Sequence, residues 1–111
     1  MEKSFLGEFE QMVLLAILQL EQSAYGHRIS AELEERAGRR VSRGALYSSL
    51  DRLERKGYLR WEIAPATSER GGQPKRRFEV TAEGLQVLRV SHQAWLSMKA
   101  GLEDLLSRQR P

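Results

Sequence analysis

The chain has 111 residues, of which 41% are hydrophobic and 30% charged, and it contains no cysteine. This length corresponds to one domain, and the composition is typical of a globular protein rather than a disordered one. The lack of cysteine excludes disulfides, thiolate catalysis and cysteine-based zinc sites, and it agrees with a cytoplasmic location. The first residues lack the basic-then-apolar order of a signal peptide, and the apolar run Met12–Leu20 is too short to cross a membrane. We therefore expect no membrane partner.

The charge is distributed unevenly along the chain. The net charge is only +3, but residues 36–77 hold 12 of the 18 lysines and arginines and only 4 of the 15 aspartates and glutamates. Both ends of the chain are acidic in comparison. This asymmetry favours a polyanion-binding surface in the middle of the chain, with the two ends serving another purpose. Ordinary solvated surface charge is the alternative explanation at this point.

The first predicted helix covers about Phe5–Gln22. No polar residue interrupts the stretch Met12–Leu18, whereas a helix on the surface of a domain shows apolar residues only every three or four positions. We therefore expect this helix to be buried on two sides. One side faces its own domain, and the other is available to a second subunit.

A second helix is predicted at about Ala24–Ala37, with Ser23 as its N-cap and Gly38 just beyond its end. Its inward-facing residues lie four apart, at Tyr25, Ile29 and Leu33. This spacing places them on one side of the helix, which should face the core.

A short extended segment at Arg39–Val41 precedes a third helix, which is predicted at about Arg43–Lys56 with Ser42 as its N-cap. Its leucines follow the spacing of one buried stripe, at positions Leu46, Leu50 and Leu53. The opposite side of this helix carries small and basic residues and should be exposed.

Two short strands follow, at Tyr58–Ile63 and Arg76–Val80. The segment between them is rich in proline, glycine and charged residues, which is typical of an exposed hairpin tip. The chain after this hairpin predicts one last helix from Ala82 to about Arg108, with Thr81 as its N-cap.

This last helix would be roughly 40 Å long at about 1.5 Å per residue, which is too long for the small preceding domain to cover. Its apolar residues fit a heptad seam in which polar Ser91 occupies one position. The residues of this seam are Leu88, Trp95, Met98, Leu102 and Leu105.

The order of elements predicts a mainly α fold with a small β-hairpin, namely a winged helix-turn-helix followed by a long C-terminal helix. The third helix begins with unpaired backbone N–H groups that favour phosphate, and a helix fits the DNA major groove. The basic hairpin would contact the DNA backbone or the minor groove. The predicted DNA contacts on the helix are Ser42, Arg43, Gly44, Tyr47, Ser48 and Arg52. Those on the hairpin are Arg70, Gly71, Gly72, Lys75 and Arg76.

Four motifs in this order resemble the PadR family of bacterial regulators: YGHRI, GALYSSLDRLERKG, GGQPKR and TAEG. The resemblance covers about Leu6–Leu88, and the motifs are specific only in combination. It implies a homodimeric repressor that binds an inverted-repeat operator in double-stranded DNA, with a DNA-binding domain at residues 1–80 and a dimerisation helix at residues 81–111. The dimer interface would then contain Phe9, Leu88, Trp95, Met98, Leu102 and Leu105.

Trp95 also resembles, by its place in the last helix, a tryptophan on which some small PadR proteins stack flat aromatic ligands. The resemblance therefore implies a small aromatic effector bound beside Trp95 at the dimer centre. Packing in the dimer core is the alternative role of this ring.

Other classes of function find little support in the sequence. His27 and His92 lie on different predicted helices without further ligands nearby, so we expect no metal site. No catalytic arrangement or phosphate loop is visible, and we expect neither an enzyme nor a bound cofactor. The competing hypothesis is a winged helix that binds only proteins, and the basic middle of the chain argues against it.

Overall fold

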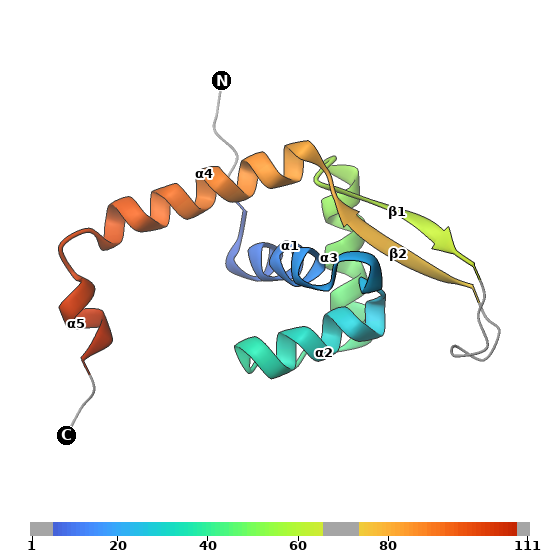
Figure 1. Ribbon diagram of the computed structural model, residues 1–111, viewed down its shortest axis with the longest axis horizontal. Coiled ribbons are helices and arrows are strands. Elements are labelled where there is room, and N and C mark those ends of the chain that lie inside the picture. Colours follow the sequence, from blue (N-terminus) through green and yellow to red (C-terminus); the bar gives the residue numbers. More distant parts are fainter. Residues whose placement is uncertain (1–5, 66–73, 109–111) are drawn as a thin grey trace.

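A computed structural model describes residues 6–65 and 74–108 of the chain. Figure 1 shows three packed helices, a hairpin on one side of them, and a helical arm on the other. The elements in chain order are α1 (Glu8–Leu20), the 3-10 turn η1 (Glu21–Ser23), α2 (Gly26–Ala37), α3 (Arg43–Arg55), β1 (Leu59–Ala64), β2 (Lys75–Val80), α4 (Ala82–Lys99) and α5 (Glu103–Ser107).

The core lies where α1, α2 and α3 meet the hairpin and the beginning of α4. The predicted inward stripes of α2 and α3 are confirmed, except that Tyr25 is only half-buried. Helical spacing puts these apolar side chains on one side, and their burial removes them from water. The core residues with the least exposure include Val13, Leu14, Ile29, Leu46, Leu50, Leu53, Leu59 and Phe78.

The hairpin is antiparallel, and Leu59 pairs with Val80 while Ala64 pairs with Lys75. The predicted extended segment at Arg39–Val41 pairs with neither strand. Tyr25 instead forms a single bridge with Arg77, and the Phe78 N–H donates to the Ala24 carbonyl at 2.9 Å. Ser23 belongs to η1, and the N-cap of α2 is Tyr25, so the predicted Ser23 cap is wrong. The sheet contact therefore fixes the residues just before α2 against the hairpin.

The prediction of one uninterrupted helix to Arg108 is wrong. Helix α4 ends at Lys99, and α5 begins at Glu103 after a turn. Gly101 has φ +87°, which a side chain rarely permits, and its N–H donates to the Glu103 carboxylate at 3.0 Å. In Figure 1, α4 leaves the three-helix body and α5 turns down at its end. The part of α4 beyond the body and α5 together form the arm.

The start of the predicted heptad seam belongs to the core of the protomer. Leu88 is only 7% exposed and Ser91 only 2%. The Ser91 hydroxyl accepts a hydrogen bond from the Leu6 N–H at 3.4 Å, which ties the segment before α1 to α4. Leu88 therefore has little surface left for a second subunit, and the exposed part of the seam begins at Trp95.

None of the helices in the described segments has the length and hydropathy that a membrane span requires.

Candidate nucleic-acid interface

The N-terminal half of α3 presents a small, polar outer surface. Ser42 occupies the N-cap as predicted, and its hydroxyl accepts a hydrogen bond from the Ala45 N–H at 3.1 Å. The leucine stripe turns toward the core, which leaves Gly44 and Ser48 exposed on the opposite side. Small side chains let a helix backbone come close to base edges in a major groove.

Tyr47 lies half-buried between α3 and the beginning of α2. Its ring contacts Phe78 edge-on, with centroids 6.3 Å apart, and the Arg43 guanidinium lies 5.2 Å above the ring centre. A Cβ on Gly26 would stand 2.2 Å from the Tyr47 hydroxyl, so only glycine at position 26 admits this ring. The hydroxyl therefore lies close against the backbone of the first turn of α2.

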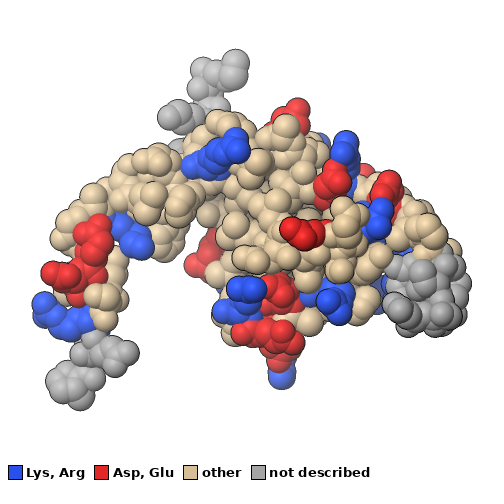
Figure 2. Space-filling view, viewed as in Figure 1, with Lys and Arg blue, Asp and Glu red and all other residues tan. Residues whose placement is uncertain are grey.

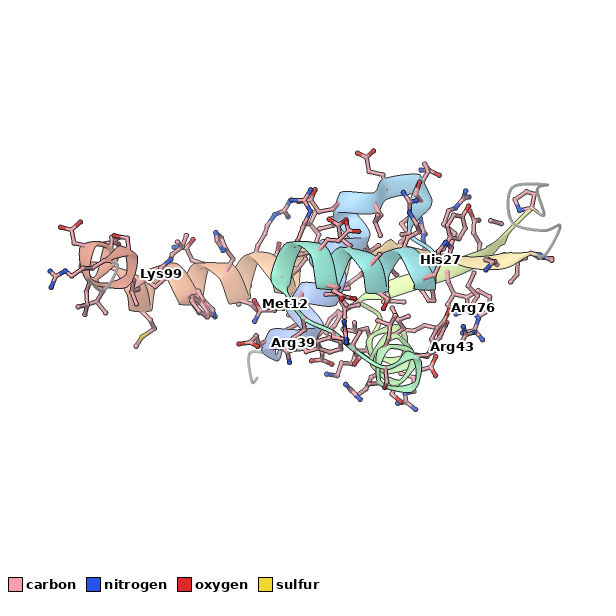
Figure 3. All side chains as sticks on the ribbon, turned by 90° about the horizontal axis from the view of Figure 1, so that it is seen from below. Met12, His27, Arg39, Arg43, Arg76 and Lys99 are labelled. Carbon is pink, nitrogen blue, oxygen red and sulfur yellow. The ribbon has the colours of Figure 1, made fainter. Side chains whose placement is uncertain are left out.

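A cleft of about 400 Å³ lies where α2, α3 and the beginning of β2 meet, at the end of the strands that leads to the hairpin tip. It is lined by His27, Arg43, Tyr47, Pro74, Lys75 and Arg76. Three cations from two elements thus face one hollow, and none of the lining residues that the structure describes is acidic. In Figure 3, His27, Arg43 and Arg76 lie at the same end of the molecule. This arrangement suits a polyanion such as a nucleic-acid backbone.

Arg76 connects the hairpin to α3. Its guanidinium stacks 4.5 Å from the centre of the Trp61 ring and lies 4.0 Å from an Asp51 carboxylate oxygen. Arg77, the next residue, points to the other face of the hairpin, where it hydrogen-bonds Glu62. That hydrogen bond raises the pKa of the Arg77 guanidinium above its usual range. Of the two arginines, Arg76 is the one that faces the cleft.

Arg52 lies away from this cleft, on the flank of α3 that faces α1. Its guanidinium contacts the Ser49 hydroxyl at 3.2 Å and a Glu10 carboxylate oxygen at 3.5 Å, and the Lys56 ammonium lies 3.2 Å from the same oxygen. Burial by itself raises the pKa of the Glu10 carboxyl. Hydrogen bonds from Lys56, the Gly7 N–H and Arg52 outweigh that effect and hold the pKa below its ordinary value. Glu10 thus already partners both cations within the protein.

Three predicted contacts, Arg70, Gly71 and Gly72, lie outside the described residues. The structure adds His27 and Trp61 to the neighbourhood of the other predicted contacts, and neither is predicted there from the sequence. His27 had been considered only as a metal ligand, and in the described part of the chain no group of three or more His, Asp or Glu side chains is arranged to hold a metal ion.

A second, apolar depression of about 360 Å³ lies on the arm, lined by Ala94, Trp95, Met98, Lys99 and Leu102. The Trp95 side chain is 57% exposed there. Figure 2 shows that the middle of the arm is largely free of charged side chains on the visible face. Phe9, by contrast, packs against the core with the Arg39 guanidinium 5.3 Å above its ring.

Residues 14–90 match the model of the transcriptional regulator PadR-like family. The solved structures similar to this chain include PadR-like proteins from three bacteria. The one from Bacteroides fragilis is 26% identical, with a TM-score of 0.68 and coverage of 87% of this chain and 88% of its own. The one from Eggerthella lenta is 28% identical, with a TM-score of 0.60 and coverage of 89% and 87%. The one from Bacillus cereus is 24% identical, with a TM-score of 0.72 and coverage of 91% and 93%. Among curated protein sequences, none matched.

Proposed function

This chain belongs to the transcriptional regulator PadR-like family, and we propose that it acts as a homodimeric repressor on an inverted-repeat operator. Proteins of this family are DNA-binding regulators of transcription and not enzymes. The predicted winged-helix fold is confirmed by the family match and the similar structures. The proposal keeps the cytoplasmic location expected from the sequence, since a regulator works where the DNA is.

The main evidence for a DNA-binding surface is the cleft between α3 and the hairpin. Arg43, Lys75 and Arg76 converge there beside the exposed, small-residue side of α3. We assign α3 to the major groove and the beginning of β2 to the neighbouring phosphates. In a dimer, two α3 helices would enter successive major grooves about 34–36 Å apart, which requires a palindromic site.

We predict that Arg43→Ala weakens binding to duplex DNA about tenfold and lowers the slope of log affinity against log salt by about one, because one phosphate contact is lost. The measurement is fluorescence anisotropy with a labelled duplex over a range of salt concentrations. Arg60→Ala is the matched control, since Arg60 pairs with Glu79 on the outer face of the hairpin. Equal affinities for the two variants would contradict the assignment. A wild-type protein without salt-dependent DNA binding would instead favour the protein-binding alternative.

We also propose that the depression around Trp95 receives a flat aromatic effector in the dimer. The exposed indole and the apolar residues beside it, Ala94, Met98 and Leu102, provide a stacking surface. In a Trp61→Phe background, where Trp95 is the remaining tryptophan, flat aromatic compounds should quench its fluorescence in a saturable manner. If no compound of a broad panel does so, Trp95 serves only to pack the interface.

A further inference from the structure

His27 supplies the only imidazole among the described residues that line the cleft between α2, α3 and the hairpin. Its side chain is exposed, and an unperturbed imidazole titrates at about pH 6.5. The other histidine of the chain, His92, lies exposed on α4, away from the cleft. His27 therefore lies at the proposed DNA surface, whereas His92 lies outside it and serves as a control.

The groups around His27 come from three elements. Tyr25 stacks on the imidazole, with ring centroids 6.2 Å apart and planes 10° from parallel. Arg43 and Tyr47 face the cleft from α3, and Lys75 and Arg76 face it from β2. The nearby acid Asp51 is engaged with Arg76. Among the lining residues that the structure describes, the permanently charged ones, Arg43, Lys75 and Arg76, are thus cations.

We propose that this cleft holds a backbone phosphate of the bound DNA and that His27 is one of its ligands, so that DNA binding takes up a proton and strengthens as the pH falls. The inference rests on the proposed function, because it needs DNA at this surface. A phosphate bound among the arginines and the lysine favours the protonated form of a neighbouring imidazole, which then donates to a phosphate oxygen.

The sign of the pH effect follows from this linkage. If the complex holds more protons than the free protein and free DNA, lower pH favours the complex. Arginine and lysine stay charged across this range and contribute a constant attraction. Among the types of side chain that line the cleft, an imidazole is the one whose ordinary titration range falls between about pH 7.5 and about pH 6.

The test is duplex binding at constant ionic strength, measured at about pH 7.5 and about pH 6 with a labelled DNA of arbitrary sequence, since phosphate contacts do not depend on sequence. We expect the wild-type protein to bind about fivefold more tightly at the lower pH, within the limit of tenfold per pH unit for one proton. His27→Gln should bind equally at both values. His27→Lys should match the tighter wild-type affinity at both values, and His92→Gln should keep the wild-type ratio.

Each outcome decides between the two ideas. DNA binding whose pH ratio survives in His27→Gln, or disappears in His92→Gln, overturns the role of His27 and leaves the proposed function standing. A wild-type protein that binds no duplex at either pH overturns both. Thermal unfolding of each variant at both pH values shows whether a lost ratio reflects a lost fold, and His27→Lys remains informative in that case because it predicts a gain at about pH 7.5.

Discussion

Replacing Gly84 with alanine should lower the free energy of unfolding by about 3 kcal/mol or more. Gly84 lies in the first turn of α4, where the helix passes directly over the residue before β1. A Cβ there would stand 2.0 Å from the Tyr58 carbonyl oxygen and 2.9 Å from Val80 Cγ1. A carbonyl oxygen cannot turn aside as a flexible side chain can, so either the helix or the strand must move.

The contacts around Gly84 leave little room for such a movement. The same Tyr58 carbonyl accepts a hydrogen bond from the Thr81 N–H at 3.1 Å, and the Thr81 hydroxyl donates to the Gly57 carbonyl at 2.7 Å. The Thr81 hydroxyl also accepts from the Gly84 N–H at 3.0 Å, which caps the helix. Moving α4 outward to admit a methyl group would break this junction and uncover the core beneath it.

Thermal unfolding checks this prediction, and the midpoint should fall by about 15 °C in a domain of this size. Gly44→Ala is the matched control, because nothing lies within 4 Å of a Cβ at position 44. Alanine there should leave the protein as stable or raise its stability by about 0.5–1 kcal/mol, since glycine is the poorer helix former. If the two variants unfold at the same temperature, the close contact at Gly84 does not limit stability.

Other glycines of the chain show how far local sequence patterns predict the fold. Gly38 was expected to end α2, and it does so in the left-handed conformation at φ +63°. Gly101 lies within the segment predicted to be one continuous helix, and it marks the turn after α4. The same residue type has the same intrinsic cost in both helices. The two glycines differ in their tertiary surroundings, and a periodic sequence pattern carries no information about those. The close contact between Gly84 and Tyr58 could not be predicted for the same reason.

The sequence also predicted the placement of some residues of the candidate interface better than that of others. Charge and helical position pointed to Arg43, Lys75 and Arg76, and the structure brings these together at one cleft. The same reasoning selected Arg52, because a helical wheel shows which side of α3 is exposed. It does not show that Glu10, from a helix far away in the sequence, meets Arg52 there. Contacts between distant segments thus decide which of the exposed cations are free to meet DNA.

The second large effect is expected from a substitution in the arm formed by α4 and α5. Val87, Leu88 and Ser91 pack one side of α4 against the body, and at about 100° per residue Trp95 and Met98 continue the same side beyond it. Their side chains are 57% and 79% exposed in a single protomer. Figure 2 shows the hollow between this arm and the body. A buried helix face that continues into solvent needs another surface, and we propose that a second copy of the chain supplies it.

The outer face of α1 offers a matching surface, since Leu15 and Leu18 are 50% and 41% exposed. We predict that the wild-type protein has twice the 12.7 kDa mass of one chain in solution. Met98→Lys should weaken the dimer at least about 100-fold, because burying an ammonium group among apolar side chains costs several kcal/mol. Analytical ultracentrifugation over a range of concentrations measures both masses.

Gln93→Lys is the matched control, because it adds the same charge to α4 on the side opposite Met98 and should leave the dimer intact. Both variants should keep the unfolding behaviour of a folded domain at protein concentrations where the wild type is monomeric, since Met98 lies outside the core. A Met98→Lys protein that remains dimeric would place the interface elsewhere, and Trp95 would then lose the enclosed pocket that an effector requires. The interface and the effector therefore depend on the same exposed residues of the arm.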